Sequence, residues 1–176
     1  GLTDGGFVSA WRHNSDGSGY GIRGRSFDSL SAPQQGDYQI NSYTYNQQYY
    51  ADVAAVPGGG YVAVWQSDSQ DKSGWGVYGQ EINQADGKVG SEFRVNTYTP
   101  GQQRYPRIAS ASDGSYFVVW ESDSEDGSST GVYAQRYKAD GTKNMNPFRV
   151  NTYIVSSQER PDVAAWPDGR FVVVWT

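Results

Sequence analysis

Cysteine is absent from the 176 residues, and histidine occurs once, at His13. Without thiols the chain can form neither a disulfide nor a thiolate metal site. A zinc centre of the usual histidine-rich kind also needs more than one imidazole. A Ser-His-Asp catalytic site would depend entirely on His13. Because these common routes to catalysis are missing, we expect the chain not to be an enzyme.

Leucine and basic charge are also scarce. Leucine occurs only at Leu2 and Leu30, too few for a helical bundle, whereas 15% of the residues are aromatic and 22 are glycine. This composition is typical of a β-rich, turn-rich fold. The net charge of −5 argues against a nucleic-acid surface, because such a surface needs a basic field. No run approaches the roughly 18 apolar residues of a membrane span, so we expect no membrane insertion.

The chain contains an internal repeat. Apolar runs end in tryptophan at Trp11, Trp65, Trp120 and Trp175, which are 54 or 55 residues apart. In register with them recur a glycine that opens a strand-like run, an apolar-Asn pair, and a small apolar run of the DVAAV type. Four landmarks that keep their register across three copies indicate a repeat architecture.

Each repeat predicts four short antiparallel strands. The DVAAV-type run is small and apolar, the FVVVW-type run is apolar throughout, the GVYAQRY-type run alternates as a half-exposed strand does, and FRVN is the most polar. Glycine turns such as 57–59 join the first two runs, because glycine supplies the positive φ of a tight hairpin. Polarity that rises outward is typical of a propeller blade. We therefore predict an all-β, β-propeller-like array of four-stranded blades, with the alanine-rich strand innermost.

The predicted blades do not begin and end with the chain, so the first and last blades are incomplete. We expect one repeat domain over 1–176, made of a partial blade 7–41, whole blades 52–96 and 107–151, and a partial blade 162–175. Propellers typically close with about four to eight blades. We therefore expect the array to continue in a longer polypeptide, or to close or extend through other copies of the chain. The final FVVVW run favours such pairing, because a bare apolar edge strand invites another strand.

The segments VVWESDSEDGSSTGVYAQRY (118–137), FRVNTY (93–98 and 148–153) and DVAAWPDGRFVVVW (162–175) resemble tandem repeats of large secreted bacterial proteins, including adhesin-like and RTX-like surface proteins. The resemblance covers essentially the whole chain. It implies an extracellular, cell-surface β-repeat module and no specific reaction.

An acidic loop follows each of the first three tryptophan runs. Asp68 and Asp71 correspond in register to Asp123 and Asp126, and Asp16 lies in the first copy. Calcium takes six to eight oxygen ligands, and two aspartates three apart in a Ser/Gly loop supply about half of such a set. The alternative is that these carboxylates bond turn amides as Asx turns. Both interpretations stay open, and Ca²⁺ is the one cofactor that the sequence suggests.

The connection from the fourth strand to the next blade is rich in tyrosine and amides. Recurring residues of this connection, together with one aromatic residue of the acidic loop, are the candidate ligand-binding residues: Tyr43, Tyr98, Tyr153, Gln48, Gln103, Gln158 and Trp75. Amides bond hydroxyls and rings stack on sugars, so a glycan is the expected partner. In an antiparallel blade this connection and the acidic loop leave from the same face. The alternative is that the recurrence reflects packing between blades.

Three functions remain open. The favoured one is an extracellular, non-catalytic binding or adhesion module that presents this face to a glycan, with calcium as an option. The second is a structural subunit of a fibre or surface assembly joined by strand sharing. The third is a glycosidase-type enzyme on a propeller scaffold, which needs a pair of carboxyl groups. It ranks last because the glutamates recur in no register; they are Glu81, Glu92, Glu121, Glu125 and Glu159.

Overall fold

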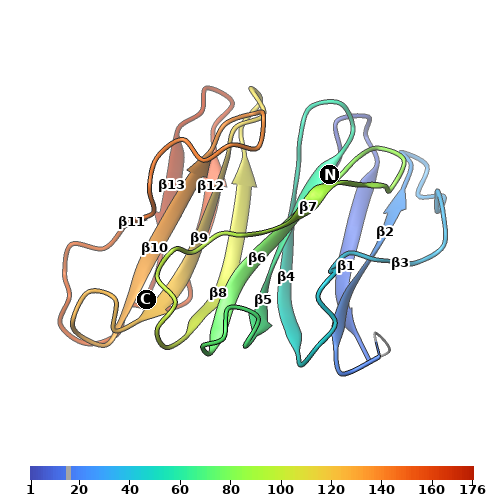
Figure 1. Ribbon diagram of the computed structural model, residues 1–176. Coiled ribbons are helices and arrows are strands. Elements are labelled where there is room, and N and C mark those ends of the chain that lie inside the picture. The colour runs from blue at the N-terminus through green and yellow to red at the C-terminus, as the bar shows by residue number, and fades with distance from the viewer. Residues whose placement is uncertain (15–16) are drawn as a thin grey trace.

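The computed structural model describes residues 1–14 and 17–176, and these residues form an all-β structure. The strands make four antiparallel sheets that stand side by side in chain order (Figure 1). The first sheet comprises β1 (Phe7–His13), β2 (Gly21–Phe27) and β3 (Tyr38–Gln39), and the second comprises β4 (Gln48–Ala55), β5 (Tyr61–Asp68), β6 (Trp75–Ile82) and β7 (Lys88–Arg94). The third comprises β8 (Gln103–Ser110), β9 (Tyr116–Asp123), β10 (Thr130–Tyr137) and β11 (Phe148–Arg149), and the fourth comprises β12 (Asp162–Ala165) and β13 (Phe171–Val174).

Both complete sheets keep their strands in chain order, β4-β5-β6-β7 and β8-β9-β10-β11. This confirms the prediction of four antiparallel strands per repeat. Glycines with positive φ stand in the predicted hairpins between first and second strands: Gly58 at 92°, Gly114 at 83° and Gly169 at 84°. A residue with a Cβ rarely adopts this backbone conformation, so the glycine turns determine where each hairpin reverses.

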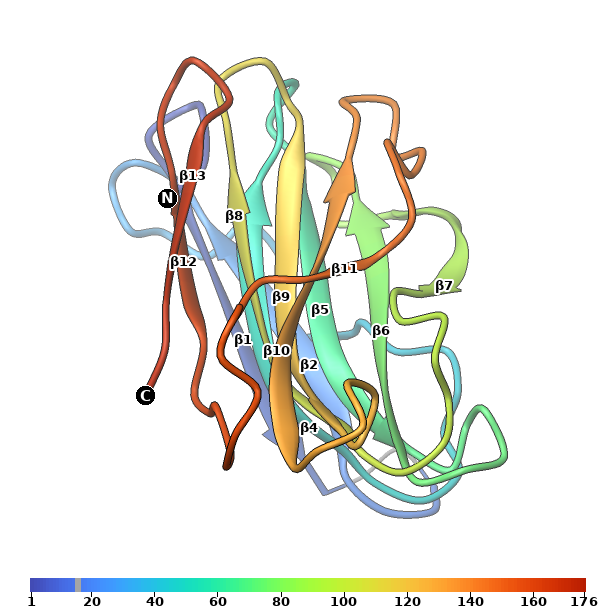
Figure 2. The same ribbon diagram turned by 90° about the vertical axis from the view of Figure 1, so that its left-hand side faces the viewer.

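The alanine-rich first strands of successive sheets are neighbours in space. β8 packs beside β4, and β12 packs beside β8, an arrangement that can be followed in Figure 2. The carboxylate of Asp52 in β4 accepts a hydrogen bond from the Ile108 backbone N–H in β8, at 3.0 Å. Small side chains allow these strands to lie close together at the inner edge of the row, as the sequence predicted for the first strand.

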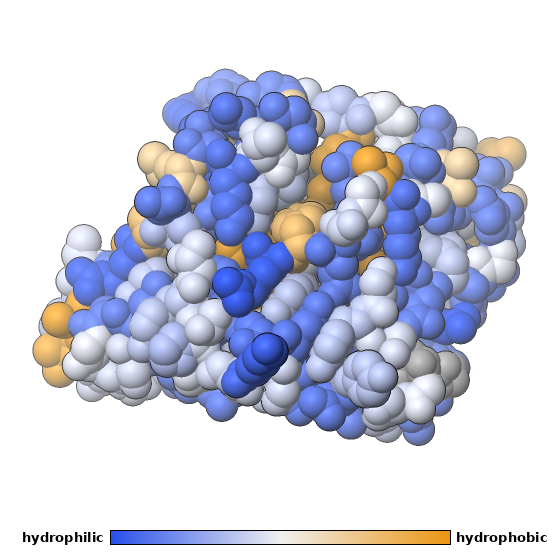
Figure 3. Space-filling view, viewed as in Figure 1, coloured by the Kyte–Doolittle hydropathy of each residue, from blue (hydrophilic) through white to orange (hydrophobic). Residues whose placement is uncertain are grey.

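The hydrophobic cores lie between sheets. One core joins the first and second sheets and consists of Ile22, Ile40, Tyr61, Ala63, Trp65, Tyr78 and Ile82. The other joins the second and third sheets and consists of Val62, Val64, Val77, Val95, Ile108, Tyr116, Val118, Trp120, Tyr133 and Tyr137. The second sheet therefore buries both faces against its neighbours, which is why β5 is apolar on both sides. In the view of Figure 1, hydrophilic residues cover most of the surface and hydrophobic ones show as small separate areas (Figure 3).

Only two of the four repeat tryptophans are fully buried. Trp65 is 0% exposed and Trp120 is 1% exposed, whereas Trp175 is 40% exposed and Trp11 is half-buried. All four tryptophans end apolar runs, yet only those of the two complete sheets are core residues. The reason is that each outer sheet has a neighbouring sheet on one side only, so the other face of its second strand is uncovered.

A clamp of two amides, repeated three times, ties each sheet to the next. Asn96 Oδ1 accepts a hydrogen bond from the Val77 N–H at 2.8 Å, and its Nδ2 donates to the Tyr98 carbonyl at 2.7 Å and to Gln103 Oε1 at 3.2 Å. Asn96 follows β7 and Gln103 begins β8, so the clamp determines how the chain crosses between sheets. The same bonds join Asn41 to Ile22, Tyr43 and Gln48, and Asn151 to Val132, Tyr153 and Gln158.

No helix long and apolar enough to span a membrane occurs among residues 1–14 and 17–176.

Candidate functional site

The acidic loops and the connections between sheets lie together at the lower end of the sheets in Figure 1. The Trp75 N–H donates to Gln102 Oε1 at 3.1 Å, and the hydroxyls of Ser129 and Ser157 are 2.7 Å apart. Each pair joins an acidic loop to the connection that enters the next sheet. These contacts confirm that the two kinds of loop share one face of the molecule.

A cavity of about 600 Å³ opens at this end, between β4, β8, β9 and the segment that leads into β12. Its lining residues are Tyr50, Arg104, Tyr105, Arg107, Glu121, Glu159, Arg160, Pro161 and Asp162. The volume lies within the range of small-molecule sites. Aromatic rings, guanidinium groups and carboxylates together provide stacking surfaces, hydrogen-bond donors and groups able to exchange a proton. We therefore treat this cavity as the candidate functional site.

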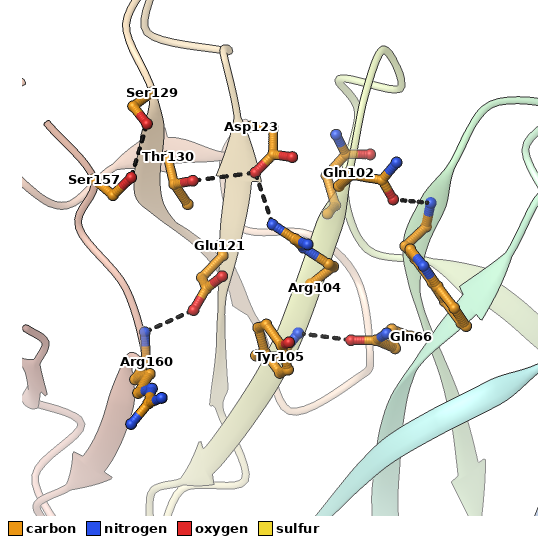
Figure 4. A network of polar contacts seen from close by, with 12 residues as sticks. Gln66, Gln102, Arg104, Tyr105, Glu121, Asp123, Ser129, Thr130, Ser157 and Arg160 are labelled. Atoms are coloured by element: carbon orange, nitrogen blue, oxygen red, sulfur yellow. Dashed lines mark hydrogen bonds and ion pairs between the residues drawn. The ribbon is translucent and has the colours of Figure 1, made fainter.

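Glu121 is the most buried ionisable group in the lining. Its residue is 2% exposed, and its Oε1 accepts a hydrogen bond from the Arg160 backbone N–H at 2.7 Å (Figure 4). Burial raises the pKa of Glu121 above the usual carboxyl value, because the charged form is poorly solvated. The hydrogen bond from Arg160 and the charge of Arg104 lower this pKa by a smaller amount. A carboxyl group that holds its proton more tightly than usual is suited to donate it in catalysis.

Arg160, whose N–H donates this bond, has a backbone conformation that recurs in the repeats. Tyr50, Tyr105 and Arg160 occupy the same position of successive repeats, and their φ angles are 55°, 52° and 54°. In β4 and β8 this position lies within a β-bulge, where the pairing shifts register. A bulge redirects the chain and its side chains, and here it places them at the cavity, because all three residues line it.

Gln66 accepts the backbone N–H of Tyr105, just as Glu121 accepts that of Arg160. The Tyr105 N–H donates to Gln66 Oε1 at 3.0 Å, and Gln66 follows Trp65 directly, as Glu121 follows Trp120 (Figure 4). An amide oxygen therefore accepts the backbone N–H at this position as well as a carboxylate oxygen does. The acidity of Glu121 is not required for this structural bond and is available for chemistry.

Two further carboxylates line the cavity. Glu159 and Asp162 are both exposed, in contrast to Glu121. Arg104 is paired with Asp123, with 3.0 Å between Nη2 and Oδ1. The site thus combines one buried carboxyl of raised pKa with two solvent-accessible carboxylates in the same lining.

Asp52 also has a raised pKa, caused by burial. Its two oxygens accept backbone hydrogen bonds from Val53 at 2.9 Å and from Ile108 at 3.0 Å. Because the bond from Ile108 joins β8 to β4, Asp52 acts as a tie between sheets, in contrast to the lining carboxyl groups.

The four predicted calcium ligands in the described residues each bond a protein group through one oxygen, while the second oxygens of Asp71 and Asp126 are buried without a partner. Asp71 Oδ1 accepts from the Ser73 N–H at 3.1 Å, and Asp126 Oδ1 from the Ser128 N–H at 3.0 Å. Asp68 accepts from the Ser69 hydroxyl, and Asp123 pairs with Arg104. The bonds of Asp71 and Asp126 to turn amides are the Asx-type bonds of the alternative interpretation.

Within the described part of the chain, no three acidic or histidine side chains are grouped to hold a metal ion. Asp16 lies outside the described residues. Calcium binding therefore stays a prediction.

The glutamines predicted to bind ligand are inside the protein. Gln48, Gln103 and Gln158 are 0%, 0% and 6% exposed, and both ends of each amide are bonded within the clamps. They do not face a ligand, and their recurrence follows from the clamp that each repeat needs. This corrects the sequence-based assignment.

The predicted tyrosines lie at the outer side of the sheets. Tyr43, Tyr98 and Tyr153 follow the fourth strands and give their backbone carbonyls to the clamps. Among the described residues none of the three lines the cavity. Trp75 is closer to it, because its ring stacks on Tyr49, next to Tyr50, with 5.4 Å between centroids.

Sequence patterns missed the cavity residues Arg104, Tyr105 and Arg160, and Glu121 was dismissed because it does not recur. One signal was present. The position directly after the repeat tryptophan is Arg12, Gln66, Glu121 or Thr176. The tryptophan is the same in every copy, whereas the residue after it differs in type. Such a residue is a candidate for a function that only one copy has.

No protein-family model matches the chain, and no curated protein matches it. Solved structures do resemble it in fold. They include an endo-arabinase from Bacteroides thetaiotaomicron VPI-5482, a thermostable family-43 glycoside hydrolase and an α-L-arabinofuranosidase from Lactobacillus brevis, with TM-scores of 0.56, 0.55 and 0.52 and 13% identity each. The matches cover 98%, 98% and 97% of this chain but 66%, 62% and 60% of those chains. The chain therefore spans less than two thirds of the length of these proteins, and the likeness at this identity shows the fold alone.

These matches contradict the function that the sequence favoured. A non-catalytic binding or adhesion module was expected, whereas the similar folds belong to glycoside hydrolases. The alternative ranked last, a glycosidase-type enzyme on a propeller scaffold, is the better supported one. The resemblance to adhesin-like and RTX-like repeats, and the extracellular location that it implies, stay predictions.

The raised pKa of Glu121 predicts a pH-dependent effect of Glu121→Gln on stability. Below the ordinary carboxyl pKa of about 4.5 both side chains are neutral and the two proteins should unfold alike. As the pH rises from there through the folded-state pKa, Glu121 becomes charged in its buried site and the native protein loses stability. The glutamine of the variant stays neutral, so Glu121→Gln should become the more stable protein.

Urea unfolding at pH 4 and pH 7 measures this difference. Gln66→Glu is the matched control, because it puts a carboxyl into the equivalent buried position and should lose stability over the same pH range. A constant difference between Glu121→Gln and the native protein would contradict the prediction.

Proposed function

We propose that the chain forms consecutive blades of a β-propeller and that the cavity at Glu121 is a glycoside-hydrolase-type carbohydrate site. Three observations support the blades: four-stranded antiparallel sheets in chain order, cores between sheets, and neighbouring first strands. The described sheets form an open row, and we propose that further repeats, in the same polypeptide or in another copy, close the ring. The exposed apolar residues Val172 and Val174 of β13, at 41% and 59%, favour this completion.

Hydrolysis of a glycosidic bond generally uses two carboxyl groups. One donates a proton to the leaving oxygen, and the other attacks the sugar or activates a water. Glu121 suits the first role, since burial raises its pKa. Glu159 or Asp162 suits the second, because each is exposed at the same cavity.

The remaining lining residues suit a sugar. Tyr50 and Tyr105 present rings that meet edge to face at 4.7 Å, and sugar rings stack on such surfaces. Guanidinium groups, which donate several hydrogen bonds in one plane, suit hydroxyl oxygens, and Arg107 and Arg160 provide them here.

The observation that carries the proposal is the comparison of Glu121 with Gln66. In two repeats the side chain after the tryptophan accepts a backbone N–H at the same position. The acceptor is a carboxyl group in the repeat at the cavity and an amide in the other repeat. Repeat folding does not account for that difference, whereas proton donation does.

A panel of oligosaccharides tests the proposed function. Arabino- and xylo-oligosaccharides are incubated with the protein, and products are separated by chromatography while binding is followed by calorimetry; a soluble starch oligosaccharide is the control. We expect binding and cleavage of a pentose oligosaccharide and neither with the control. Binding without cleavage would overturn the catalytic role of Glu121, and absence of both would overturn the carbohydrate site.

A further inference from the structure

Five aromatic rings form a continuous row that ends at the cavity. The rings of Tyr20 and Trp75 pack on Tyr49, with centroids 5.7 and 5.4 Å away. Tyr49 meets Tyr50 at 6.3 Å, and Tyr50 meets Tyr105 at 4.7 Å. The row therefore runs from the first sheet, across the second, to the third.

A second hollow lies along this row. It measures about 360 Å³ and is lined by Ala10, Trp11, Arg12, Tyr49, Tyr50 and Ala51. Tyr50 lines this hollow and the cavity at Glu121, so one residue separates the two. The Arg12 guanidinium lies over the rings of Tyr20 and Tyr49, at 5.1 and 5.3 Å. The second hollow thus has stacking surfaces and a polar donor, as the first one does.

Folding does not account for the row. In the described part of the chain none of its five residues belongs to either hydrophobic core, and Tyr50 is 50% exposed. The position of Tyr49 is Arg104 in the next repeat and Glu159 in the one after. A position that accepts tyrosine, arginine or glutamate is not one at which the repeat needs a ring. Two residues of the row, Tyr49 and Tyr50, line the second hollow.

We propose that the second hollow and this row form an additional sugar-binding subsite, so that the protein takes an extended oligosaccharide across the first three sheets. The inference rests on the proposed function, because it assigns the same ligand class to the adjoining surface. One sugar unit lies in the cavity at Glu121, and units further along the chain stack on Tyr50, Tyr49 and Trp75.

Calorimetry with arabino- or xylo-oligosaccharides of two and six units, whichever series binds the native protein, tests the subsite. The native protein should bind the six-unit sugar more tightly than the two-unit sugar. Tyr49→Ala should weaken binding of the six-unit sugar about tenfold, the effect of losing most of one ring contact, and should leave the two-unit sugar unchanged. Tyr49→Phe keeps the ring and should bind both as the native protein does.

Trp75→Ala is a second variant with the same expected pattern, in case Tyr49→Ala does not fold. Tyr45→Ala is the matched control, because Tyr45 is 68% exposed and packs on Tyr43, away from the row. Equal affinity of the native protein for the two sugars, or equal weakening of both by Tyr49→Ala, would overturn the subsite and leave the proposed function standing. Absence of binding at either length would overturn both.

Discussion

Glu121→Gln is expected to lower the rate of oligosaccharide hydrolysis by about 100- to 10,000-fold, the usual contribution of a general acid. The variant cannot donate a proton, yet its amide oxygen can still accept the Arg160 N–H, as Gln66 accepts the Tyr105 N–H. The variant should therefore have a lower kcat. Its fold and its affinity for the sugar should be unchanged. Steady-state kinetics together with circular dichroism and calorimetry measure the three quantities.

The structure provides controls for this experiment. Gln66→Ala removes the equivalent structural bond without touching an acid, and should lower stability more than activity. Glu159→Gln and Asp162→Asn, made separately, identify the second carboxylate as the one whose loss lowers kcat to a similar extent. A Glu121→Gln protein that hydrolyses at the native rate would remove Glu121 from the chemistry.

Asn96→Ala is expected to lower the free energy of unfolding by about 2–5 kcal/mol. The change removes three hydrogen bonds, two of them buried, and leaves the Val77 N–H and Gln103 Oε1 without this partner inside the protein. Each such group costs about 1–3 kcal/mol when buried and unbonded. Since domains are stable by only about 5–15 kcal/mol, this is a large part of the total. Urea unfolding followed by tryptophan fluorescence measures it.

Thr97→Ala, at an exposed neighbouring position, is the control and should change stability by less than about 0.5 kcal/mol. Combining Asn96→Ala with Gln103→Ala should cost less than the two separate losses added together, because the pair shares one bond. Full additivity, or a loss below about 1 kcal/mol for Asn96→Ala, would show that the clamp does not hold the sheets together.

Local patterns predicted the strands well but not their environment. The alternating runs of β6 and β10 were expected to be half-exposed, and they are almost wholly buried. Gln80 and Gln135 are 0% exposed, and their Nε2 atoms donate to the carbonyls of Val89 and Met145. Alternation of polar and apolar residues does not distinguish a solvated face from a buried face whose amides bond the neighbouring segment.

Residues that recur at the same position of each repeat proved important, but their recurrence did not show their role. The register singled out Gln48, Gln103 and Gln158, which proved to be clamp residues with buried amides. A repeat preserves what every copy needs for folding, whereas a site that occurs once is made of residues that differ between copies. Glu121 and Arg160 belong to this second kind, so a search for recurrence passed over them.

By itself the sequence determined the repeat, the four strands of each complete repeat, their order and the end of the sheets where the loops meet, because these follow from short-range periodicity and turn chemistry. The tertiary structure decided that Tyr50, Glu121 and Arg160 meet at one cavity. These residues come from or lead into three different sheets, and their meeting depends on the register between sheets. That register is set by the amide clamps, the bulges with positive φ and the packing of the two cores, which are contacts between residues far apart in the chain.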